Sequence, residues 1–157
     1  MLNTLIILCA KYLYIVVVLI GVVYIFLQPR EKQKRVLLLA IITLPIAYIV
    51  AKIGSVLYFD PRPFVVGNFA PLVPHIADNG FPSDHTLLTS AIASVVYPYS
   101  RRIGIILWIL ALAVGISRIA AGIHHPIDII GSIVISIVVT SIVYRFINRG
   151  STSEKYY

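Results

Sequence analysis

Several side chains with useful chemistry lie close together between two long apolar stretches. Residues 117–128 read Ser-Arg-Ile-Ala-Ala-Gly-Ile-His-His-Pro-Ile-Asp and contain Arg118, His124, His125 and Asp128. An Arg or Asp at the centre of a membrane helix costs about 2.5–3.5 kcal/mol, so such groups usually mark a functional site. A planar guanidinium suits phosphate oxygens, and an imidazole can act as a nucleophile or base. The pattern indicates chemistry on an anion.

The spacing within this stretch favours a catalytic pair. Asp128 follows His124 by one helical turn, where its carboxylate would hold the imidazole in one tautomer. Pro126 suits the first turn of a helix, which would put both histidines at its positive end. The alternative is a polar loop that only marks a membrane surface, since such residues also cap helices. This stretch alone leaves both interpretations open.

The elements that must position these residues are predicted to be membrane helices. The chain has 157 residues, of which 59% are hydrophobic and 12% charged. A span needs roughly 20 apolar residues. We therefore predict an all-α integral membrane protein of one domain, residues 1–157, with a long outer loop between the second and third helices and a mobile polar tail at 148–157. The five predicted spans cover about 2–27, 36–59, 84–99, 103–118 and 126–147.

The distribution of charge predicts the topology. The net charge is +7, but the basic residues form no stripe with interleaved aromatics, which argues against nucleic acid. Nine of the thirteen Lys and Arg fall at one end of the predicted bundle: Arg30, Lys32, Lys34, Arg35, Arg101, Arg102, Arg145, Arg149 and Lys155. By the positive-inside rule this end is cytoplasmic, with the N-terminus outside and the C-terminus inside. All four histidines then fall toward the outer face. The single Cys9 allows no internal disulfide.

Three groups of residues on that outer face resemble the signatures of the type 2 phosphatidic acid phosphatase (PAP2) superfamily. Ser117-Arg118 with His124 and Asp128 matches the third signature at every fixed position. Pro82-Ser83-Asp84-His85 matches the second, except that Asp84 replaces glycine. Lys52 with Arg62-Pro63 has the residue types of the first signature but not its spacing, because nine residues rather than six separate Lys52 from Arg62. The Pro-Ser-Asp-His form is similar to the branch that acts on polyprenyl diphosphates such as undecaprenyl or dolichyl diphosphate.

The resemblance implies a mechanism and a set of roles. His124 would be the nucleophile that forms a phosphohistidine, oriented by Asp128, and His85 would protonate the leaving group. Arg62, Arg118, Ser83, Lys52 and Asp84 would form the phosphate site, and the cationic groups would make a metal or other cofactor unnecessary. The substrate would be a polyprenyl diphosphate lipid in the bilayer. The oligomeric state is not readable from the sequence.

Two positions depart from the expected pattern. Ten residues turn a regular helix through about 1000°, which would leave Lys52 and Arg62 on different faces unless the chain bends after Asp60-Pro61. Asp84 would repel a phosphate at close range and is expected to pair with Lys52 or Arg118, or to favour the helix N-terminus. His75, Asp78 and His125 are interpreted as neighbours and not as catalysts.

Three alternatives remain at this stage. The same fold could act on phosphatidic acid or phosphatidylglycerol phosphate. A small transporter or proton-relay protein could use the intramembrane His and Asp. A zinc hydrolase could use His85, His124 and Asp128 as ligands.

Overall fold

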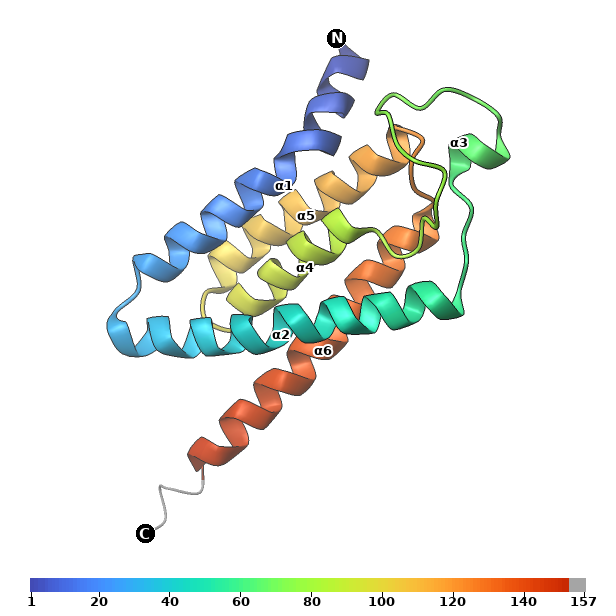
Figure 1. Ribbon diagram of the computed structural model, residues 1–157. Helices are drawn as coiled ribbons and strands as arrows, with labels where there is room; N and C mark the ends of the chain where they lie inside the picture. The colour runs from blue at the N-terminus through green and yellow to red at the C-terminus, as the bar shows by residue number, and fades with distance from the viewer. Residues whose placement is uncertain (153–157) are drawn as a thin grey trace.

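The computed structural model describes residues 1–152, and the side chains through Asn148, as a bundle of helices (Figure 1). Residues 153–157, within the predicted mobile tail, lie outside the described residues. The described part contains no strand, only an isolated bridge between Pro61 and Asn79, so the all-α prediction is confirmed. The helices are α1 (Leu2–Phe26), α2 (Arg30–Leu57), α3 (Pro63–Val66), α4 (Asp84–Val96), α5 (Arg101–Ala120) and α6 (Pro126–Thr152).

Four of these helices are long and apolar enough to cross a membrane, namely α1, α2, α5 and α6. The prediction of a third span over 84–99 is wrong in its extent. The helix there, α4, has 13 residues and ends at Val96, which gives it a length of about 20 Å against the roughly 30 Å of a hydrocarbon core. The described chain is thus a multi-pass membrane protein in which four long helices surround a short one.

Several predicted boundaries also move. The second helix begins at Arg30, not at 36, because the basic stretch 30–35 is part of the helix. The last helix continues through Thr152, so the tail predicted to be mobile from 148 is helical over its first residues. The fourth predicted span begins at Arg101, not at 103, and Ser100 caps the first turn of this helix, α5.

The short helix α4 lies at the centre of the bundle and packs against all four long helices. Nine of its residues are buried, and most of them are Thr, Ser, Ala or Val. Small side chains let helix backbones approach closely, and hydroxyls join helices where water is absent. The Ser90 hydroxyl pairs with that of Ser136 on α6 at 2.7 Å, and Ser132 donates to the carbonyl of Ser83 at 2.9 Å. These contacts fix α4 against α6.

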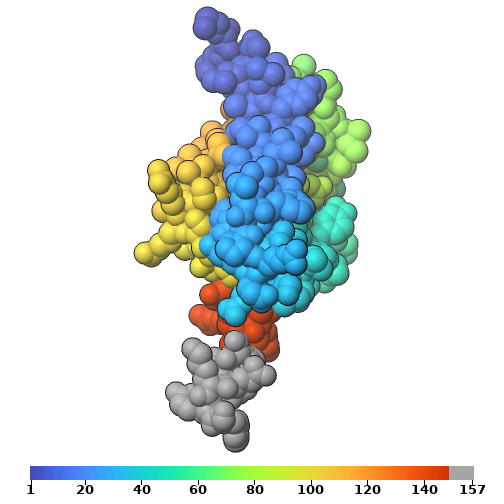
Figure 2. All heavy atoms as spheres, turned by 90° about the vertical axis from the view of Figure 1, so that its left-hand side faces the viewer, coloured from blue at the N-terminus to red at the C-terminus, as the bar shows by residue number. Residues whose placement is uncertain are grey.

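The outside of the bundle is apolar. Figure 2 shows α1 running down one face, between α5 on one side and α2 on the other. Large apolar side chains such as Leu19, Ile41 and Ile109 are more than half exposed. Exposed apolar patches of this extent are typical of a surface that faces lipid.

Candidate active site

All the predicted site residues come from one end of the bundle. This end contains the C-termini of α2 and α5, the N-termini of α4 and α6, and the connection 58–83. The opposite end contains the α1–α2 and α4–α5 turns and the basic residues of the first turns of α2 and α5. A polar cavity of about 130 Å³ opens at the first end. Its walls include Lys52, Arg62, His75, Asp84, His85, Arg118 and His124.

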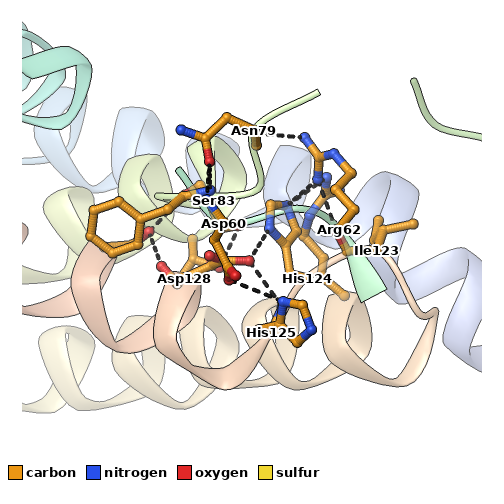
Figure 3. Close-up of polar contacts among 12 residues, drawn as sticks. Asp60, Arg62, Asn79, Ser83, Ile123, His124, His125 and Asp128 are labelled. Atoms are coloured by element: carbon orange, nitrogen blue, oxygen red, sulfur yellow. Dashed lines mark hydrogen bonds and ion pairs between the residues drawn. The ribbon is translucent and has the colours of Figure 1, made fainter. Parts of the chain in front are cut away.

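His124 is held by a tight turn between two helices. Gly122 adopts φ +76°, which costs glycine no steric strain, and it turns the chain from α5 toward α6. The imidazole Nδ1 lies 3.0 Å from Oδ2 of Asp128, which stands in the first turn of α6 and is fully buried (Figure 3). A carboxylate at Nδ1 favours the tautomer with the proton on that nitrogen. Nε2 then carries no proton, and its lone pair points to the cavity side.

Two guanidinium groups face Nε2. Arg62 Nη1 and Arg118 Nη2 each lie 3.4 Å from His124 Nε2. Arg62 also donates to the carbonyl of Ile123 at 2.8 Å, and Arg118 donates to the carbonyl of Ala10 at 3.1 Å. Both arginines are buried, at 5% and 4% exposed. The arrangement places two fixed positive groups beside Nε2, where they could bind the oxygens of a phosphate attached to that nitrogen.

The remaining members of the predicted set differ in position. His85 lies in the first turn of α4, lines the same cavity as His124 and packs edge-on against Tyr14 at a centroid distance of 4.5 Å. Lys52 also lines the cavity, because α2 ends at Leu57 and the following segment bends back. Its Nζ lies 3.8 Å from Asp84 Oδ1. The predicted pairing of Asp84 with a basic residue is therefore present, and Lys52 is its partner.

Ser83 is not brought into the cavity. It is fully buried, it is absent from the lining, and its hydroxyl accepts a hydrogen bond from Thr86 at 3.2 Å. It directly precedes α4 as expected, but its side chain caps no backbone N–H. Its backbone N–H donates to the carbonyl of Asp128 at 3.3 Å. In this structure Ser83 joins α4 to α6 and does not face the cavity.

The structure adds three residues from the long connection that the sequence analysis did not assign to the site. His75 lies with Nε2 3.5 Å from Arg118 Nη2, and Asp78 binds Arg62 at 2.6 Å. Asn79 holds the connection in shape: its amide oxygen accepts from the backbone N–H groups of Asp60 and Phe81, and its amide nitrogen donates to the carbonyl of Ser55. Nothing in their spacing distinguished these residues from an ordinary polar loop.

The electrostatics of the cavity favour a neutral imidazole at His124. Burial lowers the pKa of His124 below its usual value, and the charges of Arg118 and Arg62 act in the same direction, against the hydrogen bond to Asp128. Burial and the same two arginines lower the pKa of His75. Burial alone would raise the pKa of Asp78, but its bond to Arg62 keeps that pKa below the usual value.

One group among the described residues has donor atoms close enough to hold a metal ion. Asp60, His125 and Asp128 each place one such atom within 4.8 Å of the others. This trio differs from the predicted zinc set of His85, His124 and Asp128. In the predicted zinc set, His124 Nδ1 and Asp128 Oδ2 are hydrogen-bonded to each other, and Asp128 Oδ2 also accepts a hydrogen bond from the His125 N–H.

Comparison with known proteins identifies similar sequences and folds. Residues 35–151 match the PAP2 superfamily. The chain is 38% identical over 122 residues to undecaprenyl-diphosphatase BcrC of Bacillus subtilis, covering 78% of this chain and 63% of that protein. It is 35% identical over 130 residues to a protein of Bacillus licheniformis named bacitracin transport permease protein BcrC, covering 82% and 64%. The chain thus spans just under two thirds of the length of these relatives.

Two solved structures share the fold. The crystal structure of Aquifex aeolicus LpxE superposes with a TM-score of 0.73 at 24% identity, covering 92% of this chain and 86% of the other. A transmembrane PAP2-type phosphatidylglycerolphosphate phosphatase from Bacillus subtilis gives a TM-score of 0.64 at 25% identity, covering 94% and 76%. The helical arrangement described above is therefore a known membrane fold.

Proposed function

The chain belongs to the PAP2 superfamily, and from that premise we propose that it is a membrane phosphatase that converts a polyprenyl diphosphate to the monophosphate and inorganic phosphate. The observation that carries the proposal is the position of His124, with Nδ1 on Asp128 and Nε2 facing two buried arginines. The substrate class is supported by the relative named undecaprenyl-diphosphatase and by the Pro-Ser-Asp-His sequence at 82–85.

The reaction has two steps. His124 Nε2 forms a bond to the terminal phosphorus while the bond from that phosphorus to the bridging oxygen breaks. His85, on the same cavity, gives a proton to the departing lipid phosphate. A water then attacks the phosphohistidine with His85 as base, and inorganic phosphate leaves. His85 takes the proton of that water, and the bond between Nε2 and phosphorus breaks, so both histidines return to their starting states.

The cationic side chains would supply the positive field of the transition state. Arg62 and Arg118 are held by backbone carbonyls, so little reorganisation is needed when charge develops on the equatorial oxygens. Lys52, at the edge of the cavity, would meet the lipid-side phosphate, with its attraction partly offset by Asp84. We infer from this set that the reaction needs no metal ion.

The proposed location of the site is the outer side of the membrane. The basic residues of α2 and α5 begin those helices at the end of the bundle opposite the cavity. Under the positive-inside rule that end is cytoplasmic. The N-terminus would then be outside and the C-terminus inside.

The test is phosphate release by the purified protein from a panel of lipids, with and without excess EDTA. We expect faster release from a polyprenyl diphosphate than from phosphatidic acid or phosphatidylglycerol phosphate, and no loss of rate with EDTA. A clear preference for a monophosphate lipid would favour the second substrate class, which the similar phosphatidylglycerolphosphate phosphatase fold supports. Loss of activity in EDTA, restored by zinc, would overturn the metal-free mechanism.

A different function, transport, is favoured by the name of the Bacillus licheniformis relative. It predicts no phosphate release in detergent. It also predicts movement of a solute across vesicles that stops when an ion gradient is dissipated. Phosphate release from detergent-solubilised protein, lost in His124→Ala, excludes transport as the activity of this site.

A further inference from the structure

The carboxyl group of Asp128 has one oxygen whose hydrogen bonding is incomplete. Oδ2 accepts from His124 Nδ1 at 3.0 Å and from the His125 N–H at 2.9 Å. Oδ1 is buried and has no hydrogen-bond donor among the described residues. The residue as a whole is 0% exposed. A buried, unsatisfied carboxylate oxygen is costly, so a proton or a ligand is expected at this position.

Asp60 supplies a second carboxyl group beside that of Asp128. One of its carboxylate oxygens lies within 4.8 Å of a carboxylate oxygen of Asp128, and its Oδ2 lies 3.0 Å from His125 Nδ1. Figure 3 shows Asp60, His125 and Asp128 gathered beside His124. Asp60 is only 14% exposed in its side chain, so solvent cannot fully satisfy it.

The backbone brings the two acids together by a specific arrangement. The Asp60 N–H donates to the Asn79 side chain at 2.9 Å, and its carbonyl accepts from the Gly80 N–H at 2.8 Å. A Cβ on Gly80 would lie 2.9 Å from Asp128 Oδ2 and 3.1 Å from the Asp60 carbonyl oxygen. Glycine at position 80 therefore allows the connection to lie this close to the Asp128 carboxylate and to the backbone of Asp60.

Two ionised carboxylates in this position would repel each other, so the pair requires a compensating positive charge. The titratable groups that act on Asp60 are Asp128 and His125, and those that act on His124 are Asp128, Arg118 and Arg62. Burial raises the pKa of Asp60, and the charge of Asp128 raises it further. His125 acts in the opposite direction. A single proton fits this environment without further ligands, and a metal ion is the competing explanation.

We propose that Asp60 and Asp128 hold one proton between their carboxyl groups, and that Asp60, fixed by His125, is a positioning residue for the His124–Asp128 pair. The catalytic part of this inference rests on the proposed function. When His124 becomes a positively charged phosphohistidine, the shared proton shifts toward Asp60, and Asp128 then presents its full charge to the ring. The shift moves one proton between two oxygens and changes no other bond.

Infrared difference spectroscopy of Asp60→Asn tests the proton directly. At about pH 6, roughly two units above the usual pKa of an aspartate, the wild-type protein is expected to show the carbonyl stretch of a protonated carboxylic acid. The band should be absent in Asp60→Asn and unchanged in Glu31→Gln, whose exposed carboxylate binds only Lys34. A wild-type spectrum without the band overturns the proposal. So does about one equivalent of bound divalent metal in the purified protein, which would assign the site to a cation.

Kinetics test the positioning role. Asp60→Asn keeps the shape of the protonated acid, donating to Asp128 and accepting from His125, so it should retain activity within about tenfold. Asp60→Ala removes both contacts and should lower kcat/KM about 100-fold, the loss expected from a misplaced catalytic group. In Asp60→Asn the negative charge is confined to Asp128 beside His124, so the acid limb of kcat/KM should move to higher pH. Equal losses in the two variants, or an unshifted limb, would refute the positioning role.

The two experiments separate this inference from the proposed function. The infrared measurement needs no substrate, so it decides the shared proton even for a protein that releases no phosphate. Conversely, rapid phosphate release by a protein without the acid band would leave the enzyme assignment intact and remove only the shared proton.

Discussion

At the scale of single residues, the site is defined by what surrounds one imidazole nitrogen. His124 Nε2 is the point where the side chains of Arg62 and Arg118 converge, although these residues belong to different segments of the chain. The histidine is useful only in one tautomer, and Asp128 selects it. The proposed mechanism therefore divides the work between a reactive nitrogen, a group that orients it and two groups that bind the anion.

Replacing the orienting carboxylate should cost most of the activity without unfolding the protein. In Asp128→Asn the amide can no longer accept a hydrogen bond from Nδ1–H in the same way, so the wrong tautomer becomes populated. By analogy with the same exchange in a Ser-His-Asp triad, we expect kcat to fall about 10⁴-fold. Phosphate-release kinetics measure the effect, and a melting temperature close to wild type is the control. A fall of less than tenfold would show that Asp128 does not orient the nucleophile.

The pH dependence follows from the lowered pKa of His124. Protonation of Nε2 removes the lone pair that attacks phosphorus, so activity is lost as pH falls through the pKa of the free enzyme. Because that pKa is below the usual 6.5, the acid limb of kcat/KM should lie below pH 6.5. A pH profile of kcat/KM with a water-soluble diphosphate ester checks this. A limb above pH 6.5 would mean that Asp128 outweighs burial and the two arginines.

At the scale of elements, two glycines on different helices face the same aromatic ring. A Cβ on Gly131 of α6 would lie 2.3 Å from the ring of Phe81, whereas a Cβ on Gly54 of α2 would lie 3.4 Å from it. Phe81 in turn packs edge-on against Tyr58 at a centroid distance of 5.0 Å. The ring therefore joins the connection 58–83 to both helices.

This packing gives a matched pair of substitutions. Gly131→Ala must displace Phe81 and should lower the free energy of unfolding by about 1–3 kcal/mol, as expected for overpacking. Gly54→Ala meets only ordinary contact and should be neutral or stabilise by up to about 1 kcal/mol through helix propensity. Thermal unfolding in detergent measures both. If the two variants unfold at the same temperature, the Phe81 contact does not limit the approach of α6.

The sequence predicted the elements better than it predicted the connection between them. The apolar stretches and the 124–128 spacing were sufficient to place α1, α2, α5 and α6 and the His124–Asp128 pair. The roles of His75, Asp78 and Asn79 were missed because they depend on how residues 58–83 fold back over the bundle. The position of Lys52 depends on the same connection. Helical periodicity alone predicts that Lys52 and Arg62 lie on different faces, but α2 ends at Leu57 and both residues line one cavity.

At the scale of the whole molecule, charge and chemistry lie at opposite ends of the bundle. The proposed orientation predicts that a membrane-impermeant maleimide added to intact cells labels Ile76→Cys but not Gln33→Cys, in a Cys9→Ala background. Ile76 is 70% exposed in the connection beside the cavity, and Gln33 lies in the first turns of α2. Both sites should be labelled after the membrane is permeabilised. The reverse pattern in intact cells would invert the topology.

The convergence of Arg62 and Arg118 has a consequence for stability that does not depend on turnover. Arg62 is partly neutralised by Asp78, but within the part of the chain that the structure describes Arg118 forms no ion pair with a carboxylate. The folded state therefore holds two like charges near one point, and their repulsion is relieved when an oxyanion enters. Orthophosphate or vanadate should raise the melting temperature in proportion to the logarithm of its concentration above Kd. The melting temperature would thus report the binding of any small tetrahedral anion at the two arginines, without knowledge of the lipid substrate.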